Sequence, residues 1–333
     1  MSALSRVKLS MLDLVHIRAD HTAADAINDS VAVARHVEQL GFERFWLAEH
    51  HNLDGIASSA TAVLIGHIAG HTQRIRVGSG GIMLPNHPPL VVAEQFGTLA
   101  TMYPERIDLG LGRAPGTDQD TMRALRRRPE DAEQFPEQVQ QLQQLLAPAQ
   151  HGQKLIAIPG AGTQVPIWLL GSSLFSAQLA AQMGLPYAFA SHFAPRMLQD
   201  AVALYKRTFR PSAVLSEPYV IVGVPAIVAD TEQQAALLAT TAQQKVLSLL
   251  RGDTRLLQPP VTDMASRWLP HEQNGVESFL GAAVVGAPEQ VAQQLERLLA
   301  QTGADELMIV SDIYEQSARH HSLSLLAELV KVQ

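Results

Sequence analysis

The 333-residue sequence contains no cysteine, and aromatic side chains make up only 5% of it. Without a thiol the protein cannot form a disulfide, hold an iron–sulfur cluster on cysteine or use a cysteine nucleophile. Basic residues are also in deficit, because 25 of them face 32 acidic ones and the formal net charge is −7. This balance excludes a general nucleic-acid binder and a protein held at an anionic membrane surface.

Long apolar runs are missing as well. No stretch approaches the ~18 consecutive apolar residues of a membrane span, and the longest candidate, 219–229, is interrupted by Gly223 and Pro225. Near the first residue, Arg6 and Lys8 stand where a signal peptide needs an apolar segment. We therefore expect a cytoplasmic protein without a membrane segment.

What the sequence does contain is an alternation of short apolar runs and longer segments with helical spacing. The segment 22–40, for example, begins with a capping box of Thr22 and Asp25 and ends at Gly41. Helices are expected at 22–40, 57–72, 89–102, 119–127, 132–146, 174–183, 196–209, 232–250, 288–301 and 323–332. Eight strands, most of them apolar on both faces, are expected at 8–13, 43–48, 75–84, 106–111, 167–170, 187–190, 219–228 and 306–310.

Repeated strand–helix units imply parallel strands with right-handed crossovers, and eight such units can close a barrel. An open doubly wound sheet is the alternative, but the glycine-rich segment 78–81 continues into apolar residues and not into a helix, unlike a Rossmann fingerprint. We predict an α/β fold, a TIM-like (β/α)8 barrel that forms a single domain over residues 1–333. Insertions after strands 4 and 7, at 114–166 and 251–287, would lie at the barrel mouth.

Polar residues directly follow the second strand, at the end where a barrel builds its active site. The segment is Glu49-His50-His51, and adjacent side chains on extended backbone point opposite ways, so one histidine is expected to reach the mouth. A strand-end histidine satisfied by ordinary hydrogen bonds is the alternative. Zinc is a weaker interpretation, because no HExxH motif is present and His67 and His71 lie in a helix among apolar neighbours.

Two glycines, Gly80 and Gly81, end the third strand. Glycine permits unusual backbone angles or the close approach of a flat ligand. A simple β-bulge is the alternative interpretation of this pair.

Candidates for an anion site follow the fourth and fifth strands. Arg113 follows the fourth strand and is flanked by the glycines Gly112 and Gly116. Its planar, permanently charged guanidinium suits a phosphate or a carboxylate. Gly171, Ser172 and Ser173 precede a helix whose free amides would add to the two hydroxyls. The alternatives are a surface ion pair for the arginine and ordinary helix capping for the serines. Together these residues would suit one phosphate monoester.

Four segments, taken in order, resemble the bacterial luciferase-like flavin monooxygenase family. They are LSMLDL, GFERFWLAEHHN, RIRVGSGGIMLPNHPPLVVAEQFGTLATMYPERIDLGLGRAPGTD and LLGSSLFSAQLAAQMG. They are most similar to its small bacterial "luciferase family oxidoreductase" branch, and residues 1–130 carry most of the match. The resemblance implies a TIM-like barrel that binds FMN. Reduced FMN would be a co-substrate with O2 in oxidising a small organic substrate, and a separate NAD(P)H:flavin reductase would supply it.

The resemblance also implies roles for single residues. His50 matches a histidine that acts as a base or hydrogen-bond donor near the flavin. The pair Gly80-Gly81 matches glycines that form a cis peptide beneath the isoalloxazine ring. Arg113 and the segment Gly171-Ser172-Ser173 match phosphate-binding positions.

A homo-oligomer, most simply a dimer, is implied in the same way. The matching interface is formed by the helices 57–72 and 89–102, the second of which contains Glu94. The residues expected to line a substrate pocket are Val15, His16, Trp168, His192 and members of the segment 251–287.

Two positions depart from luciferase, and no long lid segment aligns. Gly112 stands where luciferase has a cysteine, and Gly171 stands where it has an acidic residue. We therefore do not expect light emission. The alternatives are hydride transfer with the deazaflavin F420, a flavin-binding or storage protein without turnover, and a metal-dependent barrel hydrolase.

Overall fold

The computed structural model describes residues 4–114, 118–253 and 256–331. In this part of the chain nine strands pair, all in parallel. They are β1 (Lys8–Asp13), β2 (Arg44–Leu47), β3 (Arg76–Met83), β4 (Ile107–Gly112), β5 (Ile167–Gly171), β6 (Tyr187–Phe189), β7 (Val220–Val228), β8 (Val284–Gly286) and β9 (Glu306–Val310). Because β1 pairs with both β2 and β9, and β6 with both β5 and β7, eight strands close a ring in the order β1-β2-β3-β4-β5-β6-β7-β9.

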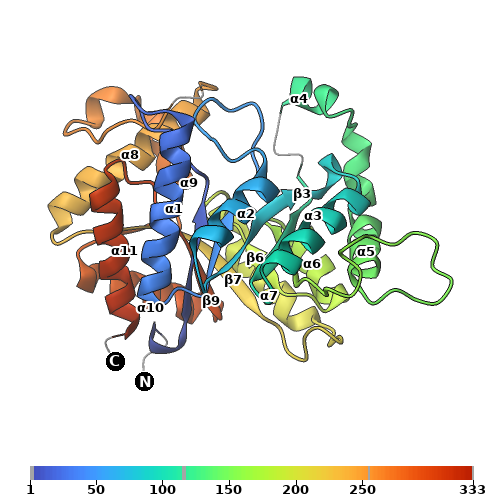
Figure 1. Ribbon diagram of the computed structural model, residues 1–333. Helices are drawn as coiled ribbons and strands as arrows, with labels where there is room; N and C mark the ends of the chain where they lie inside the picture. Colours follow the sequence, from blue (N-terminus) through green and yellow to red (C-terminus); the bar gives the residue numbers. More distant parts are fainter. Residues whose placement is uncertain (1–3, 115–117, 254–255, 332–333) are drawn as a thin grey trace.

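Helices surround this ring on its outer side (Figure 1). They are α1 (Ala23–Leu40), α2 (Thr61–His71), α3 (Pro89–Met102), α4 (Gln119–Ala124), α5 (Phe135–Leu146), α6 (Leu174–Met183), α7 (Leu198–Thr208), α8 (Glu232–Leu250), α9 (Pro270–Phe279), α10 (Pro288–Thr302) and α11 (Gln316–Lys331). The predicted TIM-like (β/α)8 barrel is therefore confirmed.

The helix ends follow local hydrogen bonding. The Thr22 side chain accepts from the Asp25 backbone N–H at the start of α1, as the capping box predicts, and Gly41 ends the helix with a φ of 86°. The α2 helix begins at Thr61, later than expected, because Ser58 and Thr61 both donate hydrogen bonds to the Ala48 carbonyl at the end of β2. The segment before α2 is thus bound to the strand end.

The two expected insertions are only partly separate from the barrel. The segment 114–166 contains α4, but also α5, which packs against α3 as an ordinary barrel helix does. The remainder, 147–166, forms the long loop beside α5 in Figure 1. The segment 251–287 contains α9, which packs on α8, and the unpredicted strand β8, which pairs with residues 226–228 of β7.

Apolar side chains form a layer between the strands and the helices, and a second cluster fills the barrel interior. Below that cluster, near the first residues of the strands, charged side chains close the barrel. Arg44 donates to Asp108 and to Glu306, in each case over 2.7 Å, and both carboxylates are fully buried. Arg76 donates to the other Asp108 oxygen over 2.6 Å. Among the described helices, none combines the length and apolar composition that crossing a membrane requires.

Candidate functional site

The carboxyl ends of the barrel strands surround a cavity of about 680 Å³. Cavities of this size bind small molecules and cofactors. All the site residues predicted from the sequence line it, namely His50, Gly80, Gly81, Arg113, Gly171, Ser172 and Ser173. The segments that follow β2, β3, β4 and β5 therefore converge on one volume.

The expected substrate-pocket residues divide into two groups. His16, His192 and part of the segment 251–287 line the cavity. Val15 and Trp168 do not. Val15 packs in the layer between strands and helices, and Trp168 fills the barrel interior. For these two residues the expectation is wrong, because their side chains are directed into apolar packing.

At Gly80 and Gly81 the cavity wall formed by β3 is bare backbone. The Gly80–Gly81 peptide bond is cis, and the pairing of β3 with β4 shifts register between Ser79 and Ile82, so the bulge interpretation also holds. A Cβ atom added at Gly81 would lie 2.7 Å from the Gly110 carbonyl oxygen. The neighbouring strand thus leaves no room for a side chain there, and a flat ligand could approach this wall closely.

The start of α6 lies on the cavity wall. Ser173 is the N-cap residue of α6, but its side chain makes no capping hydrogen bond. The interpretation as ordinary capping is therefore wrong for this hydroxyl, and the first-turn amides of α6 keep their capacity to bind an anion. Arg113 is exposed at the cavity mouth, with its guanidinium carbon 4.1 Å from the centroid of the Phe175 ring.

His50 presents a neutral imidazole to the cavity. Its backbone N–H donates to the Ser58 carbonyl over 3.0 Å, which fixes the segment after β2. Its Nδ1 atom is buried and has no hydrogen-bond partner among the described residues. Burial lowers the pKa of His50 to about 4, with smaller contributions from His16 and Lys245. At neutral pH the ring therefore has one N–H donor and one acceptor nitrogen.

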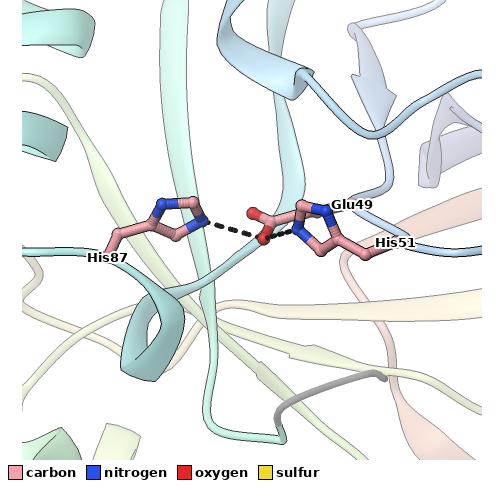
Figure 2. A group of neighbouring side chains, drawn as sticks. All are labelled: Glu49, His51 and His87. Atoms are coloured by element: carbon pink, nitrogen blue, oxygen red, sulfur yellow. Dashed lines mark hydrogen bonds and ion pairs between the residues drawn. The ribbon is translucent and has the colours of Figure 1, made fainter. Parts of the chain in front are cut away.

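The neighbouring residues Glu49 and His51 turn away from the cavity and meet His87 (Figure 2). Both histidine Nε2 atoms lie 2.8 Å from the same oxygen, Oε1 of Glu49, and the other oxygen accepts from the Met83 backbone N–H. Burial alone would raise the pKa of Glu49, but these hydrogen bonds hold it below its usual range. The prediction that one of the two adjacent histidines reaches the mouth is consistent with this arrangement.

The three side chains are of types that bind zinc, and their ligand atoms lie within 4.8 Å of one another. The Nε2 atom of each imidazole, however, already donates to the buried Glu49 carboxylate. The group is thus satisfied by its own hydrogen bonds. We interpret it as a clamp between the segments that follow β2 and β3.

Sequence reasoning missed a second polar group on the cavity wall. Lys245 of α8 lines the cavity and donates to Asp312, which follows β9. The other carboxylate oxygen of Asp312 lies 3.2 Å from His16 Nε2. His192 is nearby, and burial lowers its pKa to about 4. The available signals were a charged residue just after the last strand and a lysine inside an otherwise weakly charged helix.

The closed barrel and its polar mouth define a barrel enzyme, and comparison with known proteins identifies its family. The model of the luciferase-like monooxygenase family matches residues 7–306, so the chain belongs to that family and is a flavin-dependent oxidoreductase. YvbT of Bacillus subtilis, described as uncharacterized, is 53% identical over 324 residues, which are 97% of this chain and 96% of that protein. A luciferase-like monooxygenase of Escherichia coli is 49% identical over 97% of each chain. The crystal structure of apo-MsnO8 has 37% identity and a TM-score of 0.91, and covers 98% of this chain and 99% of its own.

The names of other similar proteins mention different substrates and cofactors. The N-acetyl-S-alkylcysteine monooxygenase of Bacillus subtilis is 31% identical over 97% of this chain and 98% of its own. Two distant structures share the fold alone. One is the oxygenating constituent of 3,6-diketocamphane monooxygenase from Pseudomonas putida with FMN, at 16% identity and a TM-score of 0.75 over 100% and 99% of the two chains. The other is an F420-dependent secondary alcohol dehydrogenase, at 14% identity and a TM-score of 0.72 over 98% and 99%.

Proposed function

We propose that this protein is an FMN-dependent monooxygenase that uses reduced FMN and O2 to oxidise a small organic substrate. A separate NAD(P)H:flavin reductase would supply the reduced flavin. The observation that carries the proposal is the convergence of a bare backbone wall, a neutral buried imidazole and an anion cradle on one cavity. These are the features that a planar ring system with one phosphate tail requires. Bound reduced FMN would supply the electrons with which O2 is cleaved into one inserted oxygen atom and water.

The anion cradle would hold the phosphate. Arg113 would donate charge-assisted hydrogen bonds from the mouth, and Ser172, Ser173 and the first amides of α6 would complete the ligand set. Gly171 has a packing reason as well, because a Cβ atom there would lie 2.2 Å from Ser176 Oγ and push α6 away from β5. The cradle suits a single phosphate group.

His50 would be the catalytic residue. Because its pKa is about 4, it is neutral at pH 7 and is not a reservoir of protons. It would instead donate one hydrogen bond, or accept one, at the reacting atoms, with no net transfer of a proton to or from the ring. The surrounding apolar side chains, among them Leu53, Phe193 and Phe279, would exclude water from these atoms.

The phosphate assignment is tested by comparing FMN with riboflavin, which lacks the phosphate. We expect Arg113→Ala to weaken binding of oxidised FMN about 10- to 100-fold, because a charge-assisted hydrogen bond contributes ~1.5–3 kcal/mol. Riboflavin affinity should change less than about threefold. Binding is followed by quenching of flavin fluorescence, and Arg123→Ala, an exposed arginine of α4 outside the cavity, is the matched control. Equal losses for both flavins, or none, would refute the assignment.

Hydride transfer with F420 is the second candidate, since a protein with the same fold uses that cofactor. F420 carries a longer and more anionic tail than FMN. Of the described residues that line the cavity, Arg113 and Lys245 are the permanent cations, and Lys245 is paired with Asp312. One unpaired cation suits the single phosphate of FMN better than the longer anionic tail of F420. Titration with both cofactors distinguishes them, and formation of an oxygenated product from substrate, reduced FMN and O2 distinguishes an enzyme from a storage protein.

We also propose that the protein is a dimer through α2 and α3. Both helices expose large apolar side chains, and Val63 and Met102 are 71% and 59% exposed. Leaving such side chains in water is unfavourable, and their gathering on adjacent helices is typical of a protein–protein interface.

A further inference from the structure

On the cavity wall formed by α8, the charge of a lysine is neutralised by a carboxylate that does not itself line the cavity. Lys245 lines the cavity, whereas its partner Asp312 does not. The Asp312 side chain is only 7% exposed, and its second oxygen faces His16. Burial alone would raise the pKa of Asp312, but the charge of Lys245 and the contact with His16 hold it well below its usual range. Asp312 is therefore an anion at neutral pH and cancels the lysine charge.

The cavity lining contains few other charged side chains. Among the described lining residues, Arg113 and Lys245 are positive and Asp253 is negative. In the proposed function Arg113 is committed to the cofactor phosphate. His50 and His192 are neutral at pH 7, because burial lowers the pKa of each to about 4. The volume left for substrate thus has no unmatched cation.

His192 also lines the cavity, and a neutral imidazole can exchange one hydrogen bond with an uncharged ligand. His192 Nδ1 is buried and lacks a partner among the described residues. The ring lies so close to β7 that a Cβ atom at Gly223 would be 2.4 Å from Nδ1. The cavity lining also contains apolar side chains, among them Phe193, Leu257 and Phe279. A ligand with one polar atom and an apolar body matches this surface.

We propose that the substrate is an uncharged, mainly apolar molecule with one hydrogen-bonding atom, and that Asp312 sets this preference by neutralising Lys245. The inference rests on the proposed function, because it assigns the cofactor to the Arg113 side of the cavity. A carboxylate at the α8 wall would lose its hydration without meeting a free cation, and it would approach the charge of Asp312. Asp312 is a specificity-determining residue that acts through Lys245.

The test compares 2-octanone with heptanoate, which share a hexyl chain and a carbonyl group but differ by a methyl group against an anionic oxygen. Binding is measured by calorimetry at pH 7.5 on protein saturated with oxidised FMN, so no turnover is needed. We expect the wild type to bind 2-octanone at least tenfold more tightly than heptanoate. Asp312→Asn should raise the affinity for heptanoate at least tenfold, because Lys245 becomes an unmatched cation, while 2-octanone changes less than threefold. His192→Leu should lower the affinity for 2-octanone several-fold, because it removes the hydrogen-bonding ring.

The matched control is the double variant Lys245→Met with Asp312→Asn, which has neither charge and should lose the gain for heptanoate. If Asp312→Asn does not fold, Lys245→Gln is used instead. We expect it to lower the affinity for heptanoate further and to leave the affinity for 2-octanone unchanged. A wild type that prefers heptanoate, fails to bind 2-octanone or shows the same ratio in Asp312→Asn overturns the inference. Failure of FMN itself to bind, measured first, would instead count against the proposed function.

Discussion

At the scale of single residues, Gly110 shows how closely β3 and β4 approach each other below the cavity. A Cβ atom at Gly110 would lie 2.1 Å from the Ser79 carbonyl oxygen, which is backbone and cannot rotate away. The Ser79 hydroxyl donates to the Gly110 carbonyl over 2.9 Å and accepts from the Gly110 N–H over 3.0 Å. Two residues further along the same strand, the nearest atom to a Cβ at Gly112 is 3.9 Å away.

Gly110→Ala is therefore expected to lower the free energy of unfolding by about 3 kcal/mol or more, since overpacking against backbone forces the strands apart. Gly112→Ala, the matched control, should change it by less than about 0.5 kcal/mol, because its site has room for a methyl group. Urea unfolding followed by circular dichroism measures both. Equal stability of the two variants would contradict this account of the β3–β4 contact.

The residues at the cavity could be predicted to the extent that they follow strands directly. His50, Gly81, Arg113 and Ser173 all stand at strand ends, and in a parallel barrel those ends meet. The pair of Lys245 and Asp312 could not be found in this way. The two residues are 67 positions apart, and one lies inside a helix, so only the packing of α8 against the end of β9 brings them together.

At the scale of elements, the starts of β2, β3, β4 and β9 are joined by buried charges. Asp108 accepts from Arg44 and Arg76, and its Oδ2 atom also accepts from Trp46 Nε1 over 3.1 Å. Tyr219, which precedes β7, donates to Glu306 over 2.8 Å. A cluster of this kind fixes strand register at the closed end of the barrel, because its hydrogen bonds join β2, β3, β4 and β9.

Asp108→Asn should lower the free energy of unfolding by about 3–5 kcal/mol, because it leaves the buried guanidinium of Arg44 without one of its two carboxylates. The denaturant midpoint reports this loss. Asp120→Asn is the control, as Asp120 pairs with Arg123 on the exposed surface of α4 and should shift stability by less than about 0.5 kcal/mol. A midpoint unchanged in Asp108→Asn would show that the cluster is dispensable for folding.

The eight ring strands could be predicted because each is a short apolar run followed by a helical pattern. The strand β8 could not, since three residues carry no recognisable periodicity and only its pairing with β7 makes it a strand. The α11 helix begins at Gln316, earlier than the expected 323, because its first two turns are polar and lack the apolar spacing on which the prediction depended.

At the scale of the whole molecule, the exposed apolar side chains of α2 and α3 mark the face that we assign to the dimer. We expect the wild type to sediment as a dimer and the double variant Val63→Asp with Met102→Asp as a monomer, since four buried carboxylates per dimer would oppose association. Val214→Asp, at another apolar position that is 54% exposed, is the control and should remain dimeric. Sedimentation velocity at several protein concentrations measures the oligomeric state of each variant. A monomeric wild type, or a double variant that remains dimeric, would contradict the proposal that α2 and α3 form the dimer interface.

The clamp of Glu49, His51 and His87 ties two sides of the mouth to a single carboxylate (Figure 2). His50 is the next residue after Glu49, and the backbone of Met83, two residues beyond Gly81, is held by the same side chain. The segment that carries His50 and the strand that carries the glycines thus share one carboxylate, and we expect a shift of either to disturb the other. An effort to reshape this protein for another substrate would do best to keep that link intact and change the opposite, α8 side.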